Sequence, residues 1–287
     1  MAVNLRAPGP GRSSGTRRAT RAGWASAAAV ALLAASACGG PSGSDVPDDA
    51  VHSAATASPG GSGEASAESE AEVTIPRVAV TAGVLQASGL GFDLSSDARS
   101  EDLTALREDP ADALEDVVVA PSACQDPLTQ LNWSPTLLAG SVEDAALSQF
   151  TAEGVSAIGT VEVAKNDDPG QLQSHYEVVQ RLLTECSSVT LNVTKPGEDG
   201  AVTPANGPLT FRTVETGYDV DSALFWSRFP NDEDLKQQSL VLIREAGDYV
   251  AMVSFIGPEN IQDTEFRQMA ESVLEVTVLE LEAQQEG

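Results

Sequence analysis

The sequence predicts an α+β domain in which helices pack on a mainly antiparallel, twisted sheet. Three observations support this fold class: an alternating strand pattern precedes a helical stripe in mid-chain, a hairpin pattern lies in the last third, and the strands need no crossover connection. These patterns fall within residues 73–287, which are enough to bury one sizeable core. We find no internal repeat and therefore expect a single domain.

Residues 1–37 have the pattern of a lipoprotein signal peptide. Five arginines precede an apolar stretch that is too short to span a membrane, and the small residues Ala-Ser-Ala at 35–37 lead directly to Cys38. We expect cleavage before Cys38 and attachment of a diacylglycerol lipid to its thiol. Ordinary signal cleavage is the alternative, because small residues also suit it and Ala35 stands where a lipobox usually has Leu.

Residues 38–72 predict a disordered tether. This segment is almost entirely Gly, Ser, Pro, Ala, Asp and Glu, and it has no Phe, Trp or Tyr. A flexible coil of this length reaches about 30 Å, which holds a domain clear of lipid headgroups. We therefore expect the domain to be anchored to the cell membrane on its extracytoplasmic face.

The charge balance excludes nucleic acid as a partner. The chain has 43 Asp and Glu against 16 Lys and Arg and a net charge of −27, and removing residues 1–37 with their five arginines leaves −32. Such a protein gains no counterion-release energy from DNA or RNA. Solubility is the simplest interpretation of the excess acid, and a surface for a basic partner or a cation is the alternative.

The three cysteines suggest one disulfide. If Cys38 carries the lipid, Cys124 and Cys186 are left as a pair, and outside the cytoplasm such a pair is oxidised. A redox or metal site is the alternative, but the chain has no C-x-x-C motif and no zinc-ligand spacing. We therefore expect neither a metal nor a cofactor.

The first half of the domain has uneven patterns. Residues 73–93 mix short apolar runs with glycines and favour neither a helix nor a strand. A short helix is expected over 100–107, and a strand over 117–119 that Pro121 ends. Alternating small and apolar residues over 155–163 predict the next strand.

A helix is predicted from about Gly170 to Cys186. Its apolar residues are four, three, four and three positions apart and form one stripe: Leu172, Tyr176, Val179, Leu183 and Cys186. Cys186 therefore faces the core, where a bond to Cys124 would hold the helix against the preceding strand. His175 is expected on the surface of this helix.

The last third predicts more strands and a final helix. Strands are expected at 189–193, around 209–211 and at 223–226. The runs 240–243 and 249–256 flank Ala-Gly-Asp and predict a hairpin, which should be central because both its faces are apolar.

Asp263 predicts the start of the last helix. From Leu274 the residues also alternate as a strand does, so the end of this helix is left open.

Several of these features resemble one known family. Pro-Ser-Ala-Cys at 121–124, a middle helix ending in Cys186 and the hairpin at 240–250 are similar to the extracellular sensor domain of the mycobacterial kinase PknH and its stand-alone actinobacterial lipoprotein relatives. The resemblance spans roughly residues 73–281. It implies a twisted antiparallel sheet with helices and a cleft that receives a ligand, and it brings no catalytic residues.

The motifs of common enzymes are absent, and we expect no catalysis. The chain has two histidines, and because His52 lies in the tether, a serine or cysteine triad would have to use His175 in the middle helix. No G-x-S-x-G elbow is present, and neither a P-loop nor a G-x-G-x-x-G motif opens a helix. The acidic run at 231–234 lacks the EF-hand spacing, so we interpret it as a solvated turn and not as a calcium site.

Three aromatic residues are candidates for a ligand-binding cleft: Trp133, Tyr218 and Trp226. Exposed aromatic faces beside acidic groups hold sugars, lipid headgroups or cations, and core packing is the alternative role. We expect a membrane-anchored module that binds or senses a small or amphiphilic ligand. The alternative is an accessory protein of an envelope complex that docks a protein partner.

Overall fold

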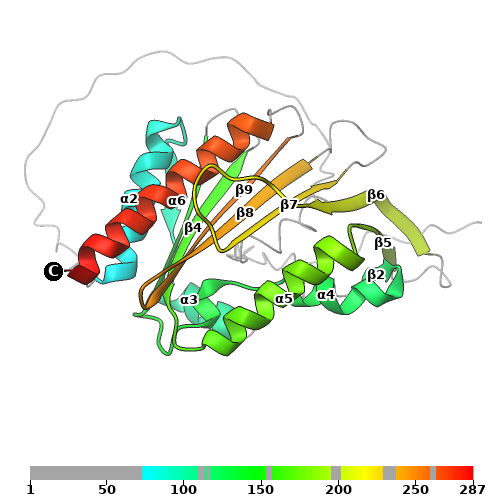
Figure 1. Ribbon diagram of the computed structural model, residues 1–287, viewed down its shortest axis with the longest axis horizontal. Coiled ribbons are helices and arrows are strands. Elements are labelled where there is room, and N and C mark those ends of the chain that lie inside the picture. The colour runs from blue at the N-terminus through cyan, green and yellow to red at the C-terminus, as the bar shows by residue number, and fades with distance from the viewer. Residues whose placement is uncertain are drawn as a thin grey trace, which may run out of the picture.

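The computed structural model describes residues 73–108, 114, 117–152, 157–194, 202–228, 237–258 and 263–286. Within these residues, nine strands form one antiparallel sheet with helices on both faces, which is the predicted α+β class (Figure 1). In sheet order, the strands are β1 (Leu94–Asp97), β3 (Ala145–Thr151), β4 (Ile158–Lys165), β9 (Tyr249–Pro258), β8 (Gln237–Ala246), β7 (Ser222–Arg228), β6 (Val202–Arg212), β5 (Ser188–Thr194) and β2 (Val117–Ala120).

Two groups of helices cover the two faces of the sheet (Figure 1). The α-helices are α2 (Ile75–Gly89), α3 (Ser100–Glu108), α4 (Gln125–Gln130), α5 (Pro169–Glu185) and α6 (Asp263–Glu286), and the 3-10 turns are η2 (Ser122–Cys124) and η3 (Pro135–Leu137). Helices α2 and α6 lie side by side on one face, and α3, α4 and α5 lie on the other. We call these the α6 face and the α5 face.

The predicted hairpin β8–β9 occupies the middle of the sheet. Leu240 and Leu242 of β8 are buried in the core of the α6 face, and Ile243 is buried in a separate cluster on the α5 face. Both faces of the hairpin are therefore covered, as its two apolar faces predicted. The connecting turn contains Gly247 at a φ of 59°, a left-handed conformation that glycine adopts without strain.

The expectation that residues 73–93 favour no regular element is wrong, because helix α2 spans most of them. The buried side of α2 is made largely of small residues, Ala79, Gly83 and Ala87, so it shows no strong apolar stripe. These residues allow close packing on α6: a Cβ atom at Gly83 would overlap the Thr277 hydroxyl. The helix is thus specified by its fit to α6 more than by its own pattern.

The C-terminal helix does not give way to a strand at Leu274. Helix α6 continues to Glu286, and its buried residues follow the helical spacing: Val273, Leu274, Thr277, Val278 and Leu281. The strand expected from 155 is described from Ile158 as β4, since residues 153–156 lie outside the described part. The predictions for residues 1–72, with Cys38 and His52, and for 231–234 also lie outside it.

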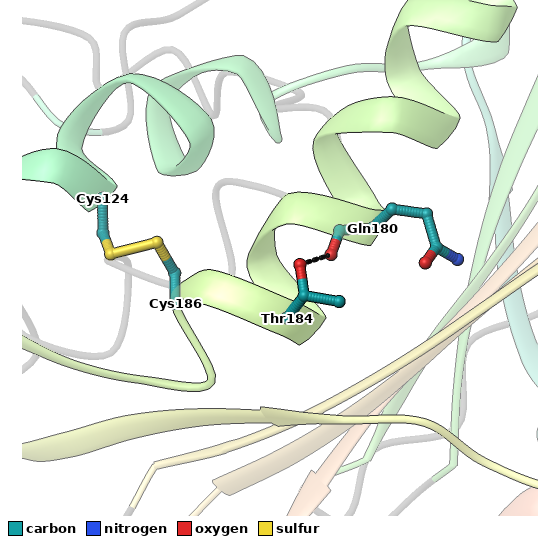
Figure 2. Close-up of a disulfide and its surroundings, with 4 residues drawn as sticks. All are labelled: Cys124, Gln180, Thr184 and Cys186. Carbon is teal, nitrogen blue, oxygen red and sulfur yellow. Dashed lines mark hydrogen bonds between the residues drawn. A yellow bond between two sulfur atoms is a disulfide. The ribbon is translucent and has the colours of Figure 1, made fainter.

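The structure contains the predicted disulfide between Cys124 and Cys186 (Figure 2). Cys124 ends η2, which follows β2, and Cys186 lies just beyond α5; their Cα atoms are 5.7 Å apart. In the last turn of α5 the Thr184 hydroxyl donates a hydrogen bond of 2.7 Å to the Gln180 carbonyl. A crosslink between residues 62 positions apart stabilises the fold by about 4 kcal/mol in the chain-entropy model.

None of the described helices is long and apolar enough to cross a membrane.

Replacing Gly159 by Ala should destabilise the domain by about 1–3 kcal/mol, because the new methyl group would overlap the Phe150 ring. Phe150 faces Gly159 from the neighbouring strand and is held by an edge contact with Phe255, with ring centroids 5.3 Å apart. The loss is measured as the free energy of unfolding in urea. Gly89→Ala is the matched control, since the added Cβ would meet no described atom within 4 Å beyond its chain neighbours and the nearby backbone of its own helix. Equal stability of both variants would contradict the close contact.

Candidate functional site

A small interior cavity lies between α5 and the α5 face of the sheet. Its volume is about 20 Å³, and it is lined by Leu131, Trp133, His175, Val179, Ser222, Leu224, Trp226, Val241, Ile243 and Met252. This volume holds about one water molecule and is far below the roughly 300 Å³ of ordinary ligand pockets. Most of the lining is apolar.

Strand register explains why β7, β8 and β9 contribute to one wall. Ser222 is the partner of Ile243, and Ile243 is in turn the partner of Met252, so the three side chains form a row on one face. The opposite wall comes from α5, where His175 and Val179 are four residues apart and thus on one side of the helix. Trp133 reaches the cavity from the segment after α4.

Trp133 and His175 form a stacked pair in this wall. Their ring centroids are 4.1 Å apart with planes inclined by 20°, and each residue is only 6% exposed. Burial lowers the pKa of His175 to about 4, so the imidazole is neutral at neutral pH. The pair therefore presents aromatic faces and ring nitrogens without a formal charge.

Two polar atoms in this wall have no hydrogen-bond partner in the part of the chain that the structure describes. Trp133 Nε1 and His175 Nδ1 are buried and make no hydrogen bond with the described residues. Buried polar atoms are normally paired, and leaving one unpaired costs about 1–3 kcal/mol. The indole N–H can only donate, whereas the neutral imidazole nitrogen donates or accepts according to its tautomer. Together they are suited to a hydroxyl or carbonyl group.

A buried carboxyl group, Glu162, lies beside the cavity. It is the register partner of Met252, a lining residue, and it accepts a hydrogen bond from Ser134, which follows Trp133 in the chain. Burial raises the pKa of Glu162 to about 7, against the opposing effect of the Ser134 hydrogen bond. Its Oε1 atom makes no hydrogen bond with the described residues. This acid therefore titrates close to neutral pH.

The structure brings two of the three predicted aromatic residues together. Trp133 and Trp226 both line the cavity, although both are buried, and Trp226 at 1% exposure also packs in the core. Tyr218 lies between β6 and β7 and packs, half-buried, against the core of the α6 face. It therefore belongs to the opposite side of the sheet.

The expectation that His175 lies on the helix surface is wrong. The buried residues Leu172, His175, Val179 and Leu182 are three, four and three positions apart, so His175 lies on the buried stripe itself. This spacing is visible in the sequence, but a polar residue was assigned to the surface. Glu162 lies between Val161 and Val163, which are buried on the α6 face. In an alternating strand its side chain points to the other face, which a polar residue suggests is exposed to solvent.

No three His, Cys, Asp or Glu side chains of the described residues gather in a way that could hold a metal ion.

No protein-family model matches the chain, and neither does any curated protein. Among solved structures, the extracellular domain of PknH from Mycobacterium tuberculosis is similar at 11% identity and a TM-score of 0.33, over 56% of this chain and 77% of that one. An uncharacterized protein from Mycobacterium smegmatis is similar at 14% identity and a TM-score of 0.38, over 71% of this chain and 100% of that one.

A fragment of a STAR-related lipid transfer protein from Xanthomonas axonopodis is 13% identical with a TM-score of 0.22, over 54% of this chain and 99% of that one. The chain thus has structural similarity to the PknH extracellular domain, at low sequence identity. All three likenesses are distant.

The pKa values of Glu162 and His175 predict opposite effects of pH on stability. The folded-state pKa of Glu162 is raised from 4.5 to about 7, so the free energy of unfolding falls as pH rises through this window. The folded-state pKa of His175 is lowered from 6.5 to about 4, so the free energy of unfolding falls as pH drops through that window.

Glu162→Gln should remove the first effect. At pH 8 the variant should be more stable than the native protein by up to about 3 kcal/mol, with little difference at pH 4.5. Urea denaturation at a series of pH values measures this difference. Glu177→Gln, at an exposed position of α5, is the control and should keep the native pH profile. Parallel profiles for Glu162→Gln and the native protein would refute the raised pKa.

Proposed function

We propose that this protein is a lipid-anchored, extracytoplasmic module that binds or senses a small or amphiphilic ligand and performs no catalysis. The supporting observation is the cavity lined by Trp133 and Trp226, in which Trp133 Nε1 and His175 Nδ1 have no partner among the described residues. A site that serves packing alone gains nothing from two unpaired polar atoms. A ligand with one hydroxyl or carbonyl group would satisfy both.

The size of the cavity limits how a ligand binds. About 20 Å³ admits one polar terminal group, so a larger ligand requires α5 to move away from the sheet. The disulfide joins the end of α5 to η2, which directly precedes α4, so these helices would move as one unit. The apolar part of the ligand would then lie against Leu224, Trp226 and Met252.

The local chemistry supports binding over catalysis. Ser222 and His175 both line the cavity, but no hydrogen bond joins these two side chains. With its pKa lowered to about 4, the imidazole is also a weak general base at neutral pH.

The disulfide supports a location outside the cytoplasm, where such bonds persist. The pattern of residues 1–38 supports the lipid anchor.

Trp133→Phe should weaken ligand binding about tenfold. The substitution keeps an aromatic ring but removes the indole N–H, which has no partner among the described residues, and one lost hydrogen bond is worth about 1 kcal/mol or slightly more. Because Trp133 is buried, the smaller ring should also lower the free energy of unfolding by about 1–3 kcal/mol. Native mass spectrometry of protein purified from its own envelope measures the fraction that carries a bound small molecule.

Tyr218→Phe is the control for this experiment, because Tyr218 lies on the other face of the sheet. It should leave the bound fraction unchanged. Native protein that carries no small molecule, or a bound fraction that Trp133→Phe leaves unchanged, would count against the proposed site.

Cys38→Ser should release the protein from the membrane. The substitution removes the thiol that is expected to carry the lipid. Membrane fractionation and intact-mass measurement of both forms test this: the native protein should be lipidated and membrane-bound. An unacylated native protein would contradict the anchor while leaving the binding proposal to its own test.

A further inference from the structure

A buried segment crosses the α5 face between α4 and β3. It consists of residues 131–138, includes η3, and carries the buried side chains of Trp133 and Ser134. We call it the Trp133 strap. The strap begins where α4 ends, close to the disulfide, and just beyond its other end Arg107 of α3 donates a hydrogen bond of 2.7 Å to the Ala139 carbonyl. With both ends held in this way, a movement of the strap is confined to its middle.

The middle of the strap is bonded to the sheet on one side and stacked on α5 on the other. The Ser134 hydroxyl donates a hydrogen bond to Glu162 Oε2 of β4 and accepts one of 3.2 Å from the Thr136 backbone N–H, which caps η3. Trp133, the preceding residue, stacks on His175 of α5. The bond to Glu162 therefore helps to hold Trp133 against α5, in the wall of the cavity.

Beneath the strap, Glu162 is in a poor environment for a negative charge. It is fully buried, its Oε1 atom has no hydrogen-bond partner among the described residues, and it forms no ion pair with any of them. Its register partners on β3 and β9 are Leu147 and Met252, and Thr160 lies two positions before it on the same face of β4. Burial is the main cause of its raised pKa, and no charged group contributes.

The other titratable groups around the strap keep their charge state near neutral pH. From α5, His175 is uncharged, since burial lowers its pKa to about 4. From α3, the Arg107 guanidinium is always charged. Beyond the end of the strap, Asp167 and Lys165 form an ion pair: a backbone hydrogen bond lowers the pKa of Asp167, and the bond to Asp167 raises that of Lys165. Among these described groups, Glu162 is the one whose charge changes between pH 6 and 8.5.

We propose that Glu162 is a pH-sensitive latch whose ionisation releases the Trp133 strap from the sheet and opens the cavity on the α5 face. A carboxylate buried without a cation is strongly unfavourable, and movement of the strap gives it water. Trp133 leaves His175 in the same movement, so α5 loses a contact that closes the cavity. The cavity is closed in mild acid and opens above neutral pH. This inference rests on the proposed function, since the cavity that opens is the proposed ligand site.

Hydrogen exchange of the two indole N–H groups in residues 38–287, those of Trp133 and Trp226, tests the latch. NMR follows both exchange rates from pH 6 to 8.5, and the Trp133→Phe variant assigns the signals. Base catalysis of exchange acts on both groups alike, so the ratio of the two rates reports opening of the strap alone. The ratio should rise about tenfold over this range, for a carboxyl whose pKa is about 7 when the strap is closed and 4.5 when it is open.

Glu162→Gln should keep the ratio constant over the whole range, because the amide is uncharged at every pH and still accepts the Ser134 hydrogen bond. Glu162→Leu carries the same expectation and replaces it if the Gln variant does not fold. Glu177→Gln is the matched control, since it removes the same charge from an exposed position of α5 and should retain the tenfold rise.

Three results would overturn the proposal. A constant ratio in the native protein would show that ionisation leaves the strap closed. Parallel acceleration at Trp133 and Trp226 would mean that the whole domain unfolds and not the strap. A rise that persists in Glu162→Gln or Glu162→Leu would assign the switch to another group. The experiment uses no ligand, so its failure leaves the binding proposal to mass spectrometry, and protein found without a bound molecule there leaves the latch to this test.

Discussion

The apolar character of both faces of the β8–β9 hairpin is the constraint on which the rest of the structure depends. Leu242 and Phe255 point to the α6 face, and Ile243 and Met252 point to the α5 face. Each such side chain contributes about 1.5–3 kcal/mol when it is buried, so neither face can be left to water. The chain meets this requirement with α2 and α6 on one side and with α5, α4 and η3 on the other. The three-layer arrangement follows from it.

The same constraint places the two cavities back to back. Phe225 and Trp226 are consecutive residues of β7, and Leu240 and Val241 are consecutive residues of β8, so each pair points to opposite faces. One member of each pair borders a larger cavity on the α6 face and the other borders the cavity on the α5 face. Since the interior is close-packed, a shift of β7 changes one wall of each site at once.

The sequence predicted the helices and strands whose apolar residues have a clear periodicity. It did not predict helix α2, which depends on tertiary packing. The helix α5, the central hairpin and the pairing of Cys124 with Cys186 follow from spacing and from cysteine count alone. Helix α2 was missed because close approach to α6 requires Ala and Gly where a sequence pattern would show Leu. The α6 pattern was ambiguous for the opposite reason: its buried side is broad, so Leu274, Val276 and Val278 also alternate as a strand would.

The candidate site was predicted in part. Trp133 and Trp226 were expected to offer exposed aromatic faces beside acidic groups, whereas the structure buries both in the cavity wall. The sequence analysis did not place His175 or Glu162 in the binding site, because polar residues are expected on the protein surface unless a buried partner can be recognised. Tyr218 was grouped with the tryptophans by residue type, but it packs on the opposite face of the sheet. Tyr218 lies in a loop, and only the tertiary fold determines which face a loop residue packs against.

Burial sets the charge state of the groups in the cavity on the α5 face, and this charge state limits the ligands that the cavity can hold. On the α5 face burial opposes ionisation of both His175 and Glu162, so ring nitrogens and hydroxyl groups are left to recognise neutral polar groups.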